Sequence, residues 1–160
     1  MKLLMNLMLI FTLGFLVISC DDETNPSILT TEKASKKATN LVSGTVTSVE
    51  VDSTGAPYWE VKITTDSGGE VEVKFDQATG NLLEIEGDVG PFDYEVTPGM
   101  GLIPFSEARA ELFAEYVDAE IIEWELEQDL EGNWVYEFDI IFNQDEISVK
   151  IDAETGNIIT

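Results

Sequence analysis

Carboxylates are the only chemically active side chains that this sequence supplies in quantity. The chain has 32 Asp and Glu residues, eight Lys and Arg residues, no His and one Cys. It therefore cannot build a Ser-His-Asp triad, a Cys-His pair or a zinc site ligated by His or Cys. It also lacks a glycine-rich phosphate loop. Carboxylate pairs could still serve acid–base chemistry, but so many acids produce close pairs by chance. We therefore expect no enzyme activity, no cofactor and no metal-ligand residues.

The single cysteine, Cys20, comes directly after a segment that is typical of an export signal. Residues 1–19 contain one cation, Lys2, and an apolar run shorter than the roughly 20 residues of a membrane-spanning helix. The segment Val17–Cys20 resembles the lipobox of bacterial lipoproteins, in which the cysteine receives a diacylglyceryl group and becomes the new N-terminus. An ordinary secretory signal or an uncleaved anchor is the alternative. We predict a signal peptide over 1–19, lipidation of Cys20 and a membrane-anchored protein of the bacterial cell envelope.

The residues after Cys20 bear on the final location. Residues 20–29 are polar and aperiodic, as expected of a lipidated tether. Their acidic run Asp21–Glu23 resembles tags that send lipoproteins to the cell surface in some Gram-negative lineages. In other lineages Asp at this position retains the protein at the inner membrane. We expect the outer membrane, with surface exposure as a further hypothesis.

The charge balance limits the possible partners. Cleavage before Cys20 removes one Lys and no acid, which leaves 7 basic against 32 acidic residues and a formal charge of −25. Such a surface repels nucleic acid and anionic lipid headgroups. It keeps an anchored domain soluble, or it attracts a basic partner. The remaining length suits one ordinary domain or two small ones.

The first half of the chain predicts one helix and four strands. The helix covers 31–41, with Thr30 or Thr31 as its N-cap. Its lysines favour a solvated face over a binding patch (Lys33, Lys36 and Lys37). Apolar residues then alternate with charged ones, which is typical of antiparallel strands with one covered face. These strands are centred on 49–51, 59–63, 71–75 and 82–85.

The second half repeats this order about 76 residues later. Ser106 should cap a helix running to about Val117, with one apolar face (Ala110, Phe113, Ala114 and Val117). Strands are expected at 122–126, 134–142 and 147–151. A D-x-x-T-G-N segment recurs at 76–81 and 152–157, where Asp and Gly favour a bulged hairpin turn. A calcium loop is the alternative, but the segment lacks the acidic density of an EF-hand.

These motifs resemble the PepSY domain. The second half carries the better match, with Tyr136–Phe138 as the aromatic-Glu-hydrophobic strand and 151–158 (IDAETGNI) as the closing motif. The resemblance implies an α+β fold of two tandem repeats, each with one helix packed on an antiparallel sheet of about four strands. It is similar to the two-repeat architecture of β-lactamase inhibitor proteins. The expected units are repeat 1 at 30–86, a linker at 87–104 and repeat 2 at 105–160.

What the resemblance implies about function concerns binding. PepSY domains occur in propeptides of secreted metallopeptidases and in envelope proteins, where they are thought to bind or restrain peptidases, and the family has no catalytic residues. The candidate contact surface is the charged side of the second sheet, where like charges across strands are destabilising. A basic partner would relieve that cost, whereas solubility and protection from edge aggregation would explain the acids without a partner. The candidate partner-binding residues are Glu123, Glu125, Glu127, Glu137 and Asp139.

The leading hypothesis is a non-catalytic envelope lipoprotein that binds or inhibits an exported peptidase or another exported protein. A surface protein that binds a ligand or Ca²⁺ is the alternative from another class. A structural or envelope-stress role without a discrete ligand is a third possibility.

Overall fold

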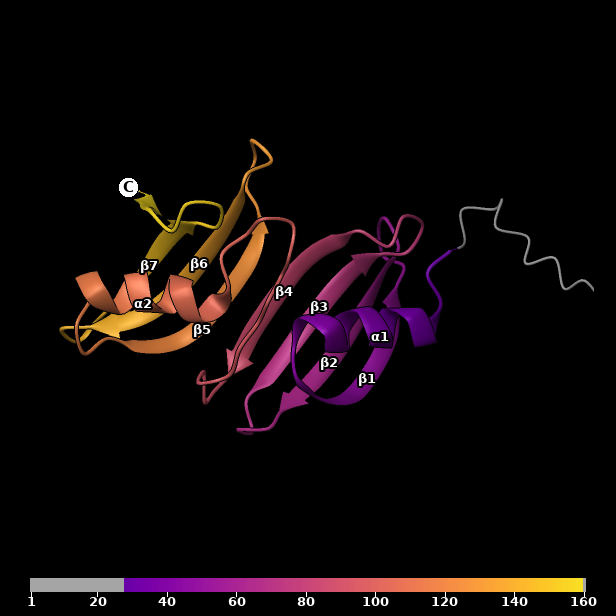
Figure 1. The fold of residues 1–160 in the computed structure, drawn as a ribbon, viewed down its shortest axis with the longest axis horizontal. Coiled ribbons are helices and arrows are strands. Elements are labelled where there is room, and N and C mark those ends of the chain that lie inside the picture. Colours follow the sequence, from indigo (N-terminus) through magenta and orange to yellow (C-terminus); the bar gives the residue numbers. More distant parts are fainter. Residues whose placement is uncertain (1–27, 160) are drawn as a thin grey trace, which may run out of the picture.

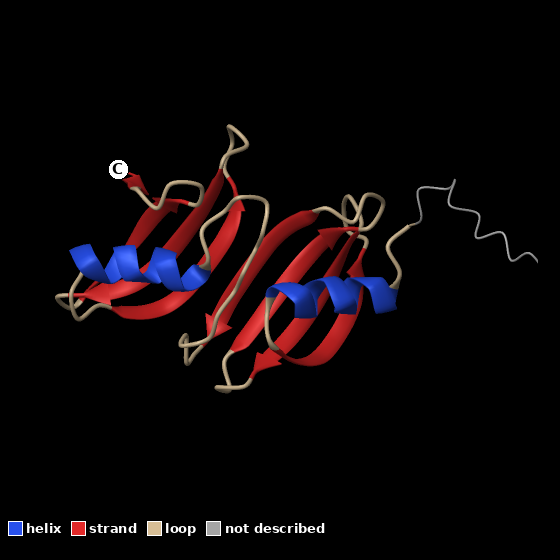
Figure 2. Ribbon diagram, in the orientation of Figure 1, coloured by secondary structure: helices blue, strands red, loops and turns tan. Residues whose placement is uncertain are grey.

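The computed structural model describes residues 28–159, which form one antiparallel sheet with two helices on one of its faces (Figures 1 and 2). The predicted signal peptide, Cys20 and most of the predicted tether, up to residue 27, lie outside the described residues. Neighbouring strands in the sheet follow chain order, so the architecture belongs to the α+β class. The elements are α1 (Thr31–Leu41), β1 (Gly44–Asp52), β2 (Tyr58–Thr65), β3 (Glu70–Asp76), β4 (Leu82–Val89), α2 (Phe105–Glu115), β5 (Glu120–Gln128), β6 (Trp134–Phe142), β7 (Asp145–Asp152) and β8 (Ile158–Ile159).

Helix α1 has the bounds that the sequence predicts. The Thr30 side chain accepts a hydrogen bond from the backbone N–H of Lys33 at 3.4 Å, which satisfies one of the helix's first free donors. Ala34 and Ala38 are fully buried. Two small residues one turn apart let the helix lie close to the sheet, mainly against β1 and β2.

The prediction for α2 is wrong in its cap and in its buried face. Pro104, not Ser106, is the N-cap residue, and its cap makes no side-chain hydrogen bond. The residues predicted to face the core are instead exposed (Ala110, Phe113, Ala114 and Val117), and the buried ones are Phe105, Ala108 and Leu112.

The physical reason for this error is the aromatic ring of Phe105. It stacks on Trp124 with ring centroids 4.2 Å apart, and it is fully buried. Both faces of the helix offer one phenylalanine, but Phe105 is placed to stack on Trp124, and Ala108 and Leu112 are buried with it. The helices are therefore related by an offset of 74 residues, not 76, because Pro104 takes the place of Thr30.

The duplication extends to the residue that precedes each helix. The indole N–H of Trp59 donates to the carbonyl of Leu29 at 2.7 Å, and the hydroxyl of Tyr136 donates to the carbonyl of Ile103 at 2.9 Å. These aromatic residues stand at equivalent places on β2 and β6, 77 residues apart in the sequence. Each repeat thus fastens the entry to its helix onto its own sheet.

The hairpin interpretation of the two D-x-x-T-G-N segments is confirmed. The carboxylates of Asp76 and Asp152 accept the backbone N–H of the threonine three residues on, at 2.6 and 2.8 Å. The following glycines have φ of 70° and 77°, a conformation that glycine adopts without strain. Because one carboxylate oxygen of each Asp is used inside its turn, these segments work as turns.

A seam between β4 and β5 joins the two repeats into one sheet. Gly87 lies opposite Trp124 there, and the Trp124 indole N–H donates to the Tyr94 hydroxyl at 2.9 Å. Tyr94 belongs to the connector before α2, which crosses the helix-covered side of the sheet between α1 and α2 (Figure 1). Its Tyr94 and Val96 are buried, as their apolar character predicts. Neither helix within residues 28–159 has the length and apolarity needed to cross a bilayer.

Candidate functional site

The face of the sheet that the helices leave uncovered is acidic at its centre. Strands alternate their side chains between faces, so burial of Ile85, Trp124 and Leu126 under the helices turns their neighbours outward. Seven half-buried carboxylates from β4, β5 and β6 form what we call the acidic sheet face: Glu84, Glu86, Glu123, Glu125, Glu127, Glu137 and Asp139.

The structure brings most of the five sequence-predicted site residues together. Glu123 lies directly opposite Asp139, and Glu125 lies directly opposite Glu137, in the register of β5 with β6. Glu127 lies opposite Val135, at the end of the row. The structure thus places acids against acids across two strands, which is the arrangement that the alternating pattern predicts.

One detail of β5 differs from the prediction. The alternation of apolar and charged residues over 122–126 predicts that Ile122 lies on the apolar side, but it is 37% exposed and Ile121 is buried instead. The register shifts between Ile121 and Glu123, and an extra residue at such a bulge changes which face the preceding side chains occupy. The acids from Glu123 onward keep their predicted side.

Sequence reasoning missed the two carboxylates that β4 contributes. Glu86 lies directly opposite Glu125 across the seam. Carboxylate oxygens of Glu84, Glu86 and Glu125 lie within 4.8 Å of one another, which is close enough for the three to hold a cation. The alternation in β4 was a usable signal, but it does not show that β4 pairs with a strand of the other repeat.

Cations neutralise only part of this face. The Lys74 ammonium lies 2.6 Å from Glu84 and 3.0 Å from Glu86, and Lys150 lies 2.7 Å from Glu137. Burial would lower the pKa of Lys74, but its hydrogen bonds to these two carboxylates raise it overall. Among the described residues, no ion pair reaches the acids of β5.

The uneven distribution of cations over this face is reflected in the pKa values of its carboxyls. Partial burial, followed by the charges of Glu84 and Glu127, raises the pKa of Glu125 to about 7. Burial, with the charges of Glu86 and Asp139, also raises the pKa of Glu123. The pKa of Glu137 is instead lowered, because Lys150 and Ser148 donate hydrogen bonds to it. The centre of the face therefore holds acids whose negative charge is poorly compensated.

A shallow depression marks the same centre. It has a volume of about 180 Å³ and lies between the paired acids of β5 and β6, with Trp124 also lining it. This is smaller than the roughly 300–1,000 Å³ of small-molecule sites. Its size and charge suit the head of one Lys or Arg side chain.

The geometry is that of a tandem-repeat α+β protein with one open, acidic sheet face. The family model described as "PepSY: Peptidase propeptide and YPEB domain" matches the chain twice, at residues 28–86 and 102–160. The chain therefore belongs to the PepSY family and carries two tandem copies of its domain.

A comparison with solved structures adds a protein of similar fold. The solved structure of a candidate lipoprotein from Clostridium difficile 630 is similar at 16% sequence identity, with a TM-score of 0.37. The similarity covers 84% of this chain and 93% of that chain. No curated protein matches the sequence.

Proposed function

We propose that this protein is a non-catalytic lipoprotein of the bacterial cell envelope whose acidic sheet face binds a basic segment of an exported protein. An exported peptidase, which the protein would restrain, is the leading partner, since PepSY domains are typically propeptide-like or inhibitor-like. The observation that carries the proposal is the row of facing carboxylates on β4, β5 and β6, whose central members have no cation among the described residues.

A need for solubility explains this face poorly. Fully exposed acids confer solubility at little cost, and the chain has many of them. The acids of the acidic sheet face are half-buried, and most of them stand opposite another acid, which is unfavourable in the unbound protein. A Lys or Arg side chain from a partner would form charge-assisted hydrogen bonds with them and relieve the repulsion.

The test is a pull-down of exported proteins with the full lipidated chain and two charge-reversal variants. Changing Glu123, Glu125 and Glu137 to Lys should abolish capture of the partner. The matched control changes Glu107, Glu111 and Glu115 to Lys, which alters the net charge equally on the exposed side of α2. Equal loss in both variants would show a net-charge effect and would overturn the assignment to this face. An activity assay on a captured peptidase then tests restraint.

The proposed location depends on Cys20 and has its own test. Mass spectrometry of the mature N-terminus should show a diacylglyceryl group on Cys20, and Cys20→Ala should abolish both this modification and the cleavage before residue 20. Separation of the two membranes should place the unaltered protein in the outer membrane, and added protease reports exposure at the cell surface. A mature N-terminus without lipid on Cys20 would overturn the lipid anchor.

A calcium-binding surface protein is the second candidate, and the Glu84, Glu86 and Glu125 cluster favours it. Hard cations such as Ca²⁺ take oxygen ligands of this kind. The Lys74 ammonium already pairs with two of the three carboxylates, which argues against it. Calorimetric titration with Ca²⁺ separates the candidates, because micromolar binding that is lost in Glu125→Gln would support calcium, and its absence leaves the protein partner.

A further inference from the structure

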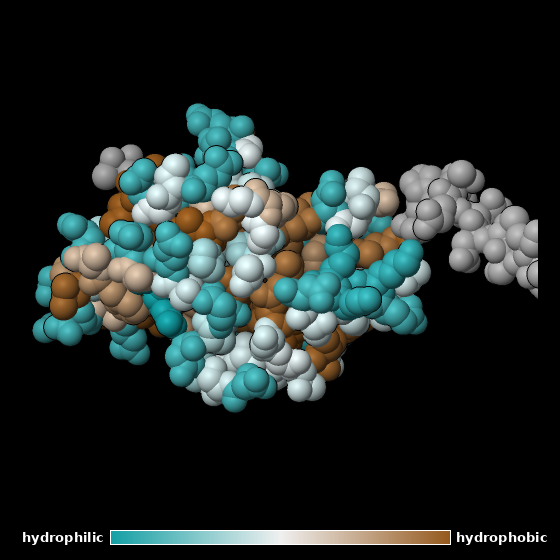
Figure 3. Space-filling view, in the orientation of Figure 1, coloured by the Kyte–Doolittle hydropathy of each residue, from teal (hydrophilic) through white to brown (hydrophobic). Residues whose placement is uncertain are grey.

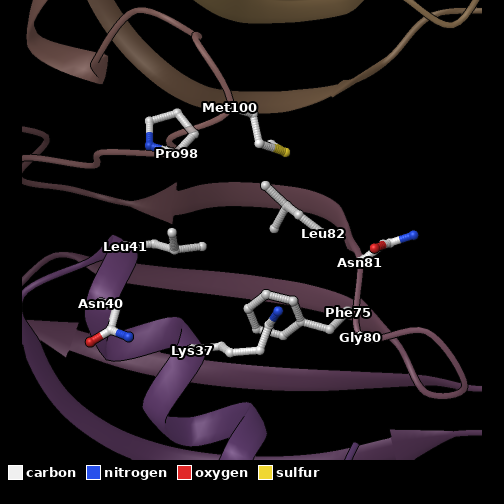
Figure 4. Close-up of a pocket in the computed structure, with 9 residues that line it drawn as sticks. All are labelled: Lys37, Asn40, Leu41, Phe75, Gly80, Asn81, Leu82, Pro98 and Met100. Atoms are coloured by element: carbon white, nitrogen blue, oxygen red, sulfur yellow. The ribbon is translucent and has the colours of Figure 1, made fainter. Parts of the chain in front are cut away.

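A pocket on the opposite side of the molecule has properties that the acidic sheet face does not share. It has a volume of about 310 Å³ and lies between α1, the turn from β3 to β4 and the connector loop (Figure 4). Apolar side chains make up most of its wall (Leu41, Phe75, Leu82, Pro98 and Met100), and Figure 3 shows hydrophobic surface beside the polar surface of α1. Lys37, Asn40 and Asn81 supply its polar groups.

Lys37 gives this pocket a positive charge in a very acidic protein. Its ammonium lies 5.6 Å from the centroid of the Phe75 ring, over the pocket, as Figure 4 shows. Lys33 and Lys36 stand on the same helix. Because the rest of the chain is strongly acidic, this is where the protein least repels an anion.

The fold does not require a lysine at position 37. With the helices offset by 74 residues, Glu111 occupies the same place in the second repeat. Lys37 lies beside Gly80 in the first repeat just as Glu111 lies beside Gly156 in the second. The two repeats thus put opposite charges at one structural position, so the shared fold by itself does not dictate a cation there.

Met100 is held over the pocket by an unfavourable turn. The N–H of Leu102 donates to the carbonyl of Gly99 at 2.9 Å, and the two residues between them have positive φ, 58° at Met100 and 83° at Gly101. Such a turn favours Asn or Gly at the position of Met100. The sequence instead places there a flexible apolar side chain that is 61% exposed and lines the pocket. Backbone strain of this kind clusters at ligand-binding sites, and methionine adapts to the shape of a ligand.

We propose that this pocket binds an apolar carboxylate, with the carboxylate on Lys37 and the apolar portion between Leu82 and Met100. Such a ligand is either the C-terminal residue of a peptide or a short fatty acid. The volume of the pocket admits one residue-sized group. This inference does not rest on the acidic sheet face, which lies on the other side of the sheet.

The chain carries its own probe for the test, because Met100 is the only methionine after residue 8. The full lipidated chain, labelled at its methionine methyl and placed in nanodiscs, is titrated with N-acetyl-leucine, its neutral amide and hexanoate, with empty nanodiscs as the blank. Saturable shifts of the Met100 signal are expected with the carboxylates, and the tighter one identifies the source. No saturation with either, or equal binding of the amide, overturns the proposal.

Two pairs of variants locate the site. Lys37→Glu should weaken binding about tenfold or more, whereas Lys36→Glu, which makes the same charge change on the same helix outside the pocket, should not. Met100→Asn should weaken binding yet raise the melting temperature by about 2–4 °C, because Asn suits the turn. Leu130→Asn, at a fully exposed position in another turn, should leave binding unchanged. Equal effects within either pair overturn the proposal.

Discussion

Glu125 is the residue of the acidic sheet face whose pKa is raised most clearly by burial and by neighbouring carboxylates. It stands between Glu86 on β4 and Glu137 on β6, and partial burial with neighbouring carboxylates raises its pKa to about 7 from 4.5. Between these two values the folded protein binds more protons at this site than the unfolded chain does. The contribution of this site to the free energy of unfolding therefore falls as the pH rises through this window.

Neutralising this side chain should stabilise the protein at high pH only. Glu125→Gln is expected to raise the free energy of unfolding at pH 8 by on the order of 1 kcal/mol, once solvent screening is allowed for. Below pH 4.5 the wild-type carboxyl is also neutral, so the difference should vanish. Urea unfolding at pH 4 and pH 8 measures this, with the exposed Glu146→Gln as control. A gain that is equal at both pH values would contradict the explanation.

Gly87 is the residue that permits the seam. A Cβ atom there would lie 2.3 Å from the indole nitrogen of Trp124 and 2.4 Å from the hydroxyl of Tyr94. We expect Gly87→Ala to lower the free energy of unfolding by about 1–3 kcal/mol, as overpacking of a filled core does. Gly55→Ala is the matched control, because its Cβ would meet nothing within 4 Å. Urea unfolding of both variants tests this. If Gly87→Ala leaves the free energy of unfolding almost unchanged, the seam is packed less tightly than these distances indicate.

At the scale of elements, the sequence predicted local structure better than pairing between repeats. The bounds of α1 follow from the Thr30 cap and the two alanines, and the strands follow from the strict alternation of apolar and charged residues. The face of α2 could not be chosen because both of its sides carry apolar residues. Its side is set by Phe105 stacking on Trp124, a long-range contact that no local pattern encodes.

The candidate site shows the same limit. The pattern in β5 and β6 predicted five acids, and their pairing across these two strands follows directly from the hairpin between them. Glu84 and Glu86 were missed because β4 and β5 are separated by a connector and a helix. The pairing of β4 with β5 depends on contacts among Gly87, Tyr94 and Trp124, which are far apart in the sequence.

The aromatic residue that fastens each helix entry gives a prediction at this scale. Tyr136→Phe removes only the hydroxyl that donates to the Ile103 carbonyl, so it should lower the free energy of unfolding by about 0.5–1.5 kcal/mol. Tyr116→Phe is the control, because the Tyr116 hydroxyl makes no hydrogen bond within residues 28–159, although its ring also packs against the core and edge-on against Phe142. Chemical unfolding of the two variants measures the difference. Equal losses would mean that the ring, not the hydroxyl, does the fastening.

At the scale of the whole molecule, two copies of one domain share a single sheet. The hydrophobic core runs without interruption from α1 through the connector to α2 and β7, and Tyr94 contacts residues of both the seam and α2. The open side of this sheet carries the acidic sheet face, and the apolar-carboxylate pocket lies on the helix side. The two proposed sites thus lie on opposite sides of one sheet, where different molecules could reach them.

The continuity of the sheet predicts that the repeats unfold together. In urea, the fluorescence of the tryptophans, which report on both repeats (Trp59, Trp124 and Trp134), and circular dichroism should give one coincident transition. Gly87→Ala disturbs only the seam, so it should lower the midpoint and, if the two repeats are stable enough apart, separate the transitions. Two transitions in the unaltered protein would show that the seam couples the repeats weakly. One coincident transition would show that the two repeats unfold as one cooperative unit.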